Sequence, residues 1–248
     1  MPYAHLTIEL LVASQESAPA HDIPMIFYLF ATGAIGWMLF NMRKLTAVKI
    51  GQSSNLKISP ITTLYQSLFF GVGQRKVFSS RFTYPSIMQF LLGWGFIELF
   101  FATTVDFFTV RGWFLAYLPG MDAPWFAALN DLGGLMLLVG VLMALYRRHV
   151  NKPEPLPQQP FKGRGNLFGD SGILILLLII DIGGFFAEAA RLAVDAPPTA
   201  WASWIGFPLA KMLPVETWIS LKPFLWWSHA LISLLFIALL PITKMFRA

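Results

Sequence analysis

The sequence predicts an all-α integral membrane protein, and three observations lead to this prediction. Hydrophobic residues make up 56% of the 248-residue chain, whereas charged residues make up only 12%. The mean hydropathy is +0.62, which is outside the range of a soluble domain. Several apolar runs reach the roughly 18 to 25 residues with which a helix crosses about 30 Å of hydrocarbon, and they lack the alternation of barrel strands.

Five apolar runs have the length and composition of membrane-spanning helices. They cover residues 23–42, 84–110, 124–146, 171–194 and 223–246. The chain shows no internal repeat and no composition shift that would mark a second domain. We therefore expect a bundle of five transmembrane helices that forms a single membrane domain over residues 1–248.

The positions of the basic residues predict the orientation of this bundle. Most of the 18 Lys and Arg residues follow the first, third and fifth spans, whereas residues 1–22 contain acidic residues and no Lys or Arg. Basic loops stay on the cytoplasmic side of a membrane. We expect the N-terminus outside, as a mature tail, and the C-terminus in the cytoplasm. Orientation also explains the net charge of +5 better than nucleic-acid binding does.

The segment between the first two spans predicts a short amphipathic helix at residues 59–78. Ser59 suits the N-cap, Pro60 suits the first helical position, and apolar residues follow at helical spacing. Such a helix lies in the membrane interface. It is either a connector that lies on the membrane or a docking surface for a cytoplasmic partner.

Ionisable side chains inside the apolar runs are the candidate functional residues. His229 lies within the last run, whereas His5, His21 and His149 lie outside all the predicted spans. An ionisable group at membrane depth is costly in hydrocarbon, so its presence indicates a functional site.

A polar cluster is expected near the outer ends of the helices. Glu188 and Arg191 are three residues apart on one helix, which predicts either an ion pair or a proton path and quinone contact. Quinol oxidation releases protons, which a carboxylate or a histidine can accept. The residues expected at this level, and hence the candidate quinone site, are Asp106, Asp131, Glu188, Arg191 and His229.

Two further carboxyl groups, those of Glu98 and Asp181, fall nearer the middle of the membrane. An unpaired carboxylate at this depth is expected to carry a proton. Together with Glu188 these residues would suit a transporter or a proton channel. The chain lacks the inverted repeats and broken half-helices of such proteins, which argues against that function.

Short motifs resemble those of one family of membrane cytochromes. GQRK at residues 73–76, WGF at residues 94–96, and Glu188 and Arg191 within GGFFAEAAR carry the resemblance. The chain resembles the nitrate reductase gamma-subunit-like membrane cytochromes b, and most nearly the membrane domain of heterodisulfide-reductase-related iron–sulfur oxidoreductases. The likeness covers most of the chain. It implies five helices in a prokaryotic cytoplasmic (inner) membrane, b-type haem, and electron transfer between quinone and a cytoplasmic iron–sulfur partner.

The same resemblance implies four histidine ligands on the second and last helices, and this chain keeps one of them. His229 stands at the outer ligand position of the last helix, whereas the other three positions hold Gln89, Leu99 and Arg247. Arginine stays protonated and leucine has no lone pair, so neither can bind iron. We therefore expect a quinone and at most one haem b, with His229 as its axial ligand.

The sequence thus favours a membrane subunit of a quinone-linked respiratory electron-transfer complex. The chain contains no cysteine, so the thiolates of any iron–sulfur cluster would belong to a cytoplasmic partner. The alternative is a haem-free membrane anchor for that partner, in which His229 is a satisfied buried polar residue. An autonomous enzyme is not expected, because phosphate loops, nucleophile elbows and zinc-site spacings are absent.

Overall fold

The computed structural model describes residues 25–50, 61, 83–110, 123–151 and 169–240. Every regular element within these residues is helical, which confirms the predicted all-α class. The amphipathic helix expected at residues 59–78 lies outside the described residues, apart from Ile61. The elements are α2 (Met25–Ile50), α4 (Thr83–Val110), α5 (Pro124–Tyr146), η2 (Arg147–Asn151), α6 (Gly169–Asp195), η3 (Ala200–Ala202), α7 (Gly206–Ala210) and α8 (Val215–Leu239).

Four helices in the described part of the chain are long and apolar enough to cross a membrane. These stretches are Thr83–Val105, Pro124–Asn151, Ser171–Asp195 and Val215–Leu239. The apolar part of α2, Ile26–Asn41, is shorter. Large apolar side chains on the outer surfaces of the helices are exposed, as expected where a helix faces lipid. The multi-pass membrane architecture is confirmed, whereas the fifth span and the orientation stay predictions.

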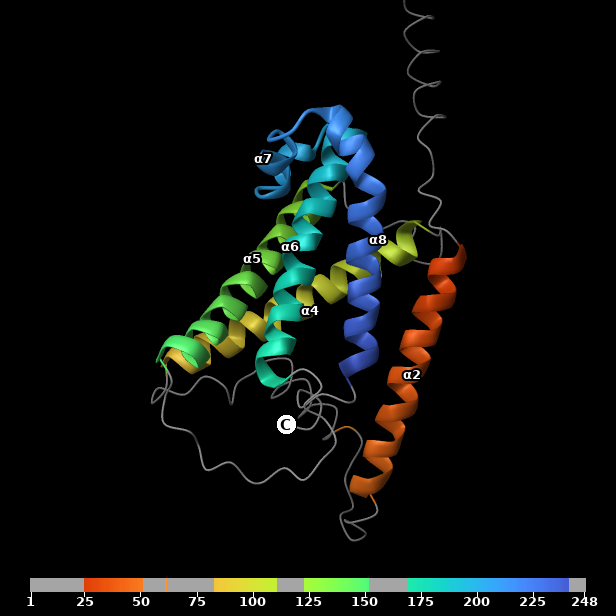
Figure 1. Cartoon of the computed structure of the whole chain (residues 1–248), viewed down its shortest axis with the longest axis vertical. Helices are drawn as coiled ribbons and strands as arrows, with labels where there is room; N and C mark the ends of the chain where they lie inside the picture. Colours follow the sequence, from red (N-terminus) through yellow and green to blue (C-terminus); the bar gives the residue numbers. More distant parts are fainter. Residues whose placement is uncertain (1–24, 51–60, 62–82, 111–122, 152–168, 241–248) are drawn as a thin grey trace, which may run out of the picture.

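The long helices pack in succession. Helix α4 packs against α5, α5 against α6, and α6 against α8, while α2 lies at the edge of the bundle beside α8 (Figure 1). Helix α4 crosses the bundle obliquely (Figure 1). The short helices η3 and α7 cover the end where α6 finishes and α8 begins, which we call the α7 end.

Glycines allow α4 and α5 to approach each other closely. A Cβ atom on Gly95 would lie 2.6 Å from the backbone nitrogen of Leu137, and one on Gly140 would lie 2.7 Å from the backbone nitrogen of Leu92. No methyl group fits in either place. Because lipid tails are as apolar as leucine, helices in a membrane associate largely through such close packing of small residues.

An apolar core lies between α4, α5, α6 and α8. Leu137 and Val141 of α5, Leu177 of α6 and Phe236 of α8 are all buried in it. The ring of Phe96 from α4 meets that of Phe236 edge to face, with centroids 6.0 Å apart. These contacts join the oblique helix α4 to the rest of the bundle.

Helix α8 begins before the proline at which the sequence analysis places its start. It runs from Val215 and includes Pro223, although proline removes a helical hydrogen bond. Trp218 in the first turn explains the earlier start. Only 1% of its surface is exposed, its indole N–H donates to the carbonyl of Ala210 at 2.9 Å, and its backbone N–H donates to the carbonyl of Pro214. This anchorage holds the helix together upstream of the proline.

The glycine contacts predict where an added methyl group destabilises the bundle. Gly95→Ala and Gly140→Ala should each lower the free energy of unfolding by about 1–3 kcal/mol, because the methyl group forces α4 and α5 apart. Gly36→Ala on α2 is the matched control, since a Cβ atom there has no neighbour within 4 Å. Thermal unfolding of the purified chain in detergent measures the difference. Equal stability of all three variants would contradict close α4–α5 packing.

Candidate functional site

The imidazole ring of His229 lies against helix α6. Its Nδ1 atom is 3.0 Å from the carbonyl oxygen of Ile180, and a Cβ atom on Gly184 would lie 3.2 Å from its Cε1 atom. The neighbouring Gly183 also contacts the ring. The two glycines thus form a recess for the imidazole. A methyl group at Gly184 would force the ring to shift by a few tenths of an ångström, whereas one at Gly183 would meet it at ordinary van der Waals distance.

The hydrogen bond to Ile180 also decides which ring nitrogen is available for chemistry. A carbonyl oxygen only accepts, so Nδ1 donates and must carry the hydrogen. In the neutral ring, Nε2 then keeps its lone pair. A histidine oriented in this way by a backbone carbonyl is suited to accept a proton or to bind a metal through Nε2.

Glu188 and Arg191 form an ion pair at the α7 end of helix α6. Arg191 Nε donates to Glu188 Oε2 at 3.0 Å, and Arg191 Nη2 donates to Glu188 Oε1 at 2.9 Å. The hydroxyl group of Ser203 donates to Glu188 Oε1 at 3.3 Å. The two Arg191 hydrogen bonds confirm the ion pair that the three-residue spacing predicts. The Ser203 hydrogen bond connects α6 to the segment that follows η3.

Asp131 of helix α5 holds the turn that leads into α7. Only 1% of its surface is exposed, and its Oδ2 atom accepts a hydrogen bond of 2.8 Å from the backbone N–H of Ile205. The N–H groups of Trp204 and Gly206 face the same carboxylate. Backbone donors satisfy this buried carboxyl group and offset part of the cost of burying it. Asp131 therefore attaches the turn to the bundle.

The structure brings together three of the five residues of the predicted outer cluster. Asp131, Glu188 and Arg191 gather at the α7 end, where the two carboxylates are close enough to repel each other. His229 lies deeper, at the level of Ile180 to Gly184, which is one to two helical turns before Glu188. Asp106 belongs to the last turn of α4, and its side chain lies outside the described residues.

The resemblance implies three further haem-ligand positions, and none of them places a second metal-binding group beside His229. Gln89 is exposed, Leu99 packs against the apolar core, and Arg247 lies outside the described residues. Across the described part of the chain, no group of three or more His, Cys, Asp or Glu residues is placed to hold a metal ion. The residues near His229 therefore do not fit a haem with two histidine ligands.

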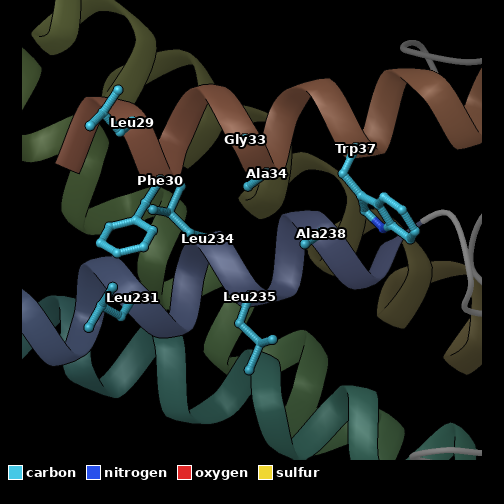
Figure 2. A pocket seen from close by; sticks show the side chains of 9 residues that line it. All are labelled: Leu29, Phe30, Gly33, Ala34, Trp37, Leu231, Leu234, Leu235 and Ala238. Atoms are coloured by element: carbon cyan, nitrogen blue, oxygen red, sulfur yellow. The ribbon is translucent and has the colours of Figure 1, made fainter. Parts of the chain in front are cut away.

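A groove of about 420 Å³ separates α2 from α8 (Figure 2). Its α8 residues follow His229 by two, five, six and nine positions, so the groove lies on the face of α8 opposite the imidazole. All of its lining side chains are apolar or small, apart from the indole N–H of Trp37. It suits an alkyl chain rather than a polar head group. The lining residues are Leu29, Phe30, Gly33, Ala34, Trp37, Leu231, Leu234, Leu235 and Ala238.

Two serines that are not among the predicted site residues lie near these polar groups. Ser203 contacts Glu188 from the segment between α6 and α8, and no sequence spacing relates the two residues. Ser233 follows His229 by four positions, which places it on the same face of α8. Its position could have been inferred from this helical spacing, whereas that of Ser203 required the folded loop.

Four apolar helices with polar side chains buried between them define a multi-pass α-helical membrane protein. No model of a known protein family and no solved structure matches the chain. The chain is similar to the protein named EtfAB:quinone oxidoreductase from Syntrophomonas wolfei subsp. wolfei, with 29% identity over 178 residues. The match covers 64% of this chain and 23% of that relative, so the chain spans less than a quarter of the relative's length.

We predict that the stability of the turn before α7 depends on the carboxyl group of Asp131. Asp131→Ala removes the acceptor from buried backbone N–H groups, and each group left unsatisfied costs about 1–3 kcal/mol. Amide hydrogen exchange at residues 204–206 should become faster. Asp195→Ala is the control, because its ion pair with Lys222 is partly exposed and should contribute at most about 1 kcal/mol. Unchanged exchange at residues 204–206 would show that Asp131 does not hold the turn.

Proposed function

We propose that the chain is a membrane subunit of a quinone-linked electron-transfer complex in a prokaryotic cytoplasmic membrane. It passes electrons between membrane quinone and a cytoplasmic iron–sulfur partner. The observation that carries this proposal is the similarity to a protein whose name specifies a quinone and an oxidoreductase. The four apolar helices support it, because a membrane quinone reacts within the bilayer.

His229 is the residue that we assign to the quinone head group. Its Nδ1 atom is bound to the carbonyl of Ile180, so Nε2 is the nitrogen that we assign to the reaction. Nε2 can accept a proton from a quinol hydroxyl group, and the protonated ring can donate a hydrogen bond to a quinone oxygen. The glycine recess fixes the position of the ring, which favours a defined contact over a mobile one.

We propose that the polar residues at the α7 end form the mouth of the site, by which we mean its connection with the aqueous phase. Asp131, Glu188 and Arg191 lie one to two helical turns beyond His229, on the side predicted to be outer. We assign Asp106 to the same mouth from its position in the last turn of α4. Carboxylates at this level can exchange protons between His229 and the aqueous phase.

The proposed iron–sulfur partner follows from the composition of the chain. The sequence contains no cysteine, and iron–sulfur clusters are held by cysteine thiolates. More than three quarters of the length of EtfAB:quinone oxidoreductase lies outside the match. We therefore place the cluster in a cytoplasmic partner protein. We propose that this partner contacts the basic segments that follow the first, third and fifth spans.

The second candidate function is that of a haem-free anchor that holds the same partner at the membrane. One observation favours it specifically. The hydrogen bond of His229 to Ile180 and the contact of its ring with Gly183 and Gly184 are also what a purely structural buried histidine would make. In this case the chain binds the partner but contributes no group to electron or proton transfer.

A substitution at His229 separates the two functions. His229→Gln in the complete complex should leave assembly intact and lower quinone-linked electron transfer by at least about tenfold, because acid–base groups contribute about 10² to 10⁴ in rate. His149→Ala is the control, since His149 is exposed in η2. Turnover with a soluble quinone and gel filtration of the complex measure the two effects.

Wild-type turnover in the His229→Gln complex would favour the anchor. Bound-quinone analysis and a reduced-minus-oxidised visible spectrum of the same preparation provide an independent check. Bound quinone without a b-type band is the expected result, and a b-type band that is lost in His229→Gln would instead make His229 a haem ligand.

A further inference from the structure

Three buried side-chain atoms in the described part of the chain have no hydrogen-bond partner. They are Glu98 Oε2 on α4, Asp181 Oδ2 on α6 and Ser233 Oγ on α8. Buried polar groups are almost always hydrogen-bonded, so each exception needs an explanation. These three come from three different helices of the bundle.

The two carboxyl groups both lie next to helix α5, and this helix gives their relative position. The carboxyl group of Glu98 lies where a Cβ atom of Gly133 would be, and Asp181 Oδ1 lies 3.4 Å from the Cβ position of Gly134. Gly133 and Gly134 are consecutive, so the two carboxyl groups reach the same turn of α5 from its two sides. Only 5% of the surface of Asp181 is exposed.

Helix α6 relates the carboxyl groups to His229. The imidazole contacts Ile180, Gly183 and Gly184, which flank Asp181 in the chain. Ser233 follows His229 by four positions, and its hydroxyl group is therefore one turn away on the same face of α8. Two carboxyl groups, one hydroxyl group and one imidazole thus lie across the middle of the bundle, where water is scarce.

The charges near the carboxyl groups favour their acid forms. The other Asp, Glu, Lys, Arg and His residues with described side chains on these helices are Asp131 on α5, Glu188, Arg191 and Asp195 on α6, and Glu216, Lys222 and His229 on α8. Lys222 is paired with Asp195. Arg191 is paired with Glu188, and Asp131 meets the turn before α7. No described cation therefore contacts Glu98 or Asp181. An ionised carboxylate without a partner is very costly in a membrane, so each group carries its proton at rest.

We propose that Glu98 and Asp181 form a proton-holding pair in the middle of the membrane, which exchanges protons with the redox site at His229. This inference rests on the proposed function. Reduction of a quinone to a quinol consumes two electrons and two protons. The iron–sulfur partner supplies the electrons, and the two carboxyl O–H groups supply the protons in succession. Each carboxylate regains its proton from the aqueous phase, and in quinol oxidation every transfer is reversed.

Chemical labelling tests the state of the pair without any redox activity. Dicyclohexylcarbodiimide is apolar and adds to protonated carboxyl groups, so it should modify Glu98 and Asp181 in the full chain in native membranes. Glu216, which is exposed in the first turn of α8, is the matched control and should stay unmodified. Peptide mass spectrometry locates the adducts. Absence of adducts at both Glu98 and Asp181 would overturn the proposal.

Substitutions test the connection with the redox site. Glu98→Gln and Asp181→Asn keep the size and hydrogen-bonding capacity of each side chain but cannot release a proton. Each should lower quinone-linked turnover of the assembled complex by at least about tenfold, whereas Glu216→Gln should not. Normal turnover in the double variant would refute the pair while leaving the proposed function intact. A wild-type complex that assembles and is labelled but shows no quinone-linked turnover would refute the proposed function, and the coupling with it.

Discussion

Close contact between helices at glycines is the constraint on which this bundle depends. At Gly95 and Gly140 the backbones of α4 and α5 meet with no room for a methyl group. At Gly133 and Gly134 the same freedom is used differently, because a side chain from a neighbouring helix, Glu98 or Phe185, enters the space that a Cβ atom would fill. At Gly184 the ring of His229 lies 3.2 Å from the Cβ position. The glycines therefore decide both how near the helices lie and where polar groups can be buried between them.

The polar residues of the membrane region lie at two depths, one at the α7 end and one in the middle of the bundle. At the α7 end, Asp131, Glu188 and Arg191 are satisfied by each other and by the turn before α7, which is how charges persist in a partly buried place. In the middle of the bundle, Glu98 Oε2 and Asp181 Oδ2 have no hydrogen-bond partner among the described residues, and Nδ1 of His229 is bound to the carbonyl of Ile180. The polar groups at the end of the bundle are thus paired, whereas those at its centre keep atoms without a partner among the described residues.

The similarity to EtfAB:quinone oxidoreductase and the central polar level support one interpretation together. Quinone chemistry couples electron transfer to proton transfer. Histidine and carboxyl groups in a water-poor interior are suited to this task, because protons can be held there without free exchange with solvent. The apolar groove between α2 and α8 adds a surface for an alkyl chain, but it faces away from His229.

The sequence by itself determined that this is an all-α multi-pass membrane protein, because the length and hydropathy of each apolar run depend on local composition alone. It also determined the ion pair of Glu188 with Arg191, since helical spacing places the two side chains together. Only the tertiary structure decided that helix α8 begins at Val215, through the burial of Trp218, and that Asp131 holds a turn more than 70 residues away in the chain. It also placed the ring of His229 against Ile180 and Gly184 of α6. The relative depth of residues on different helices depends on how those helices slide and cross, and glycine contacts between segments far apart in sequence set that packing.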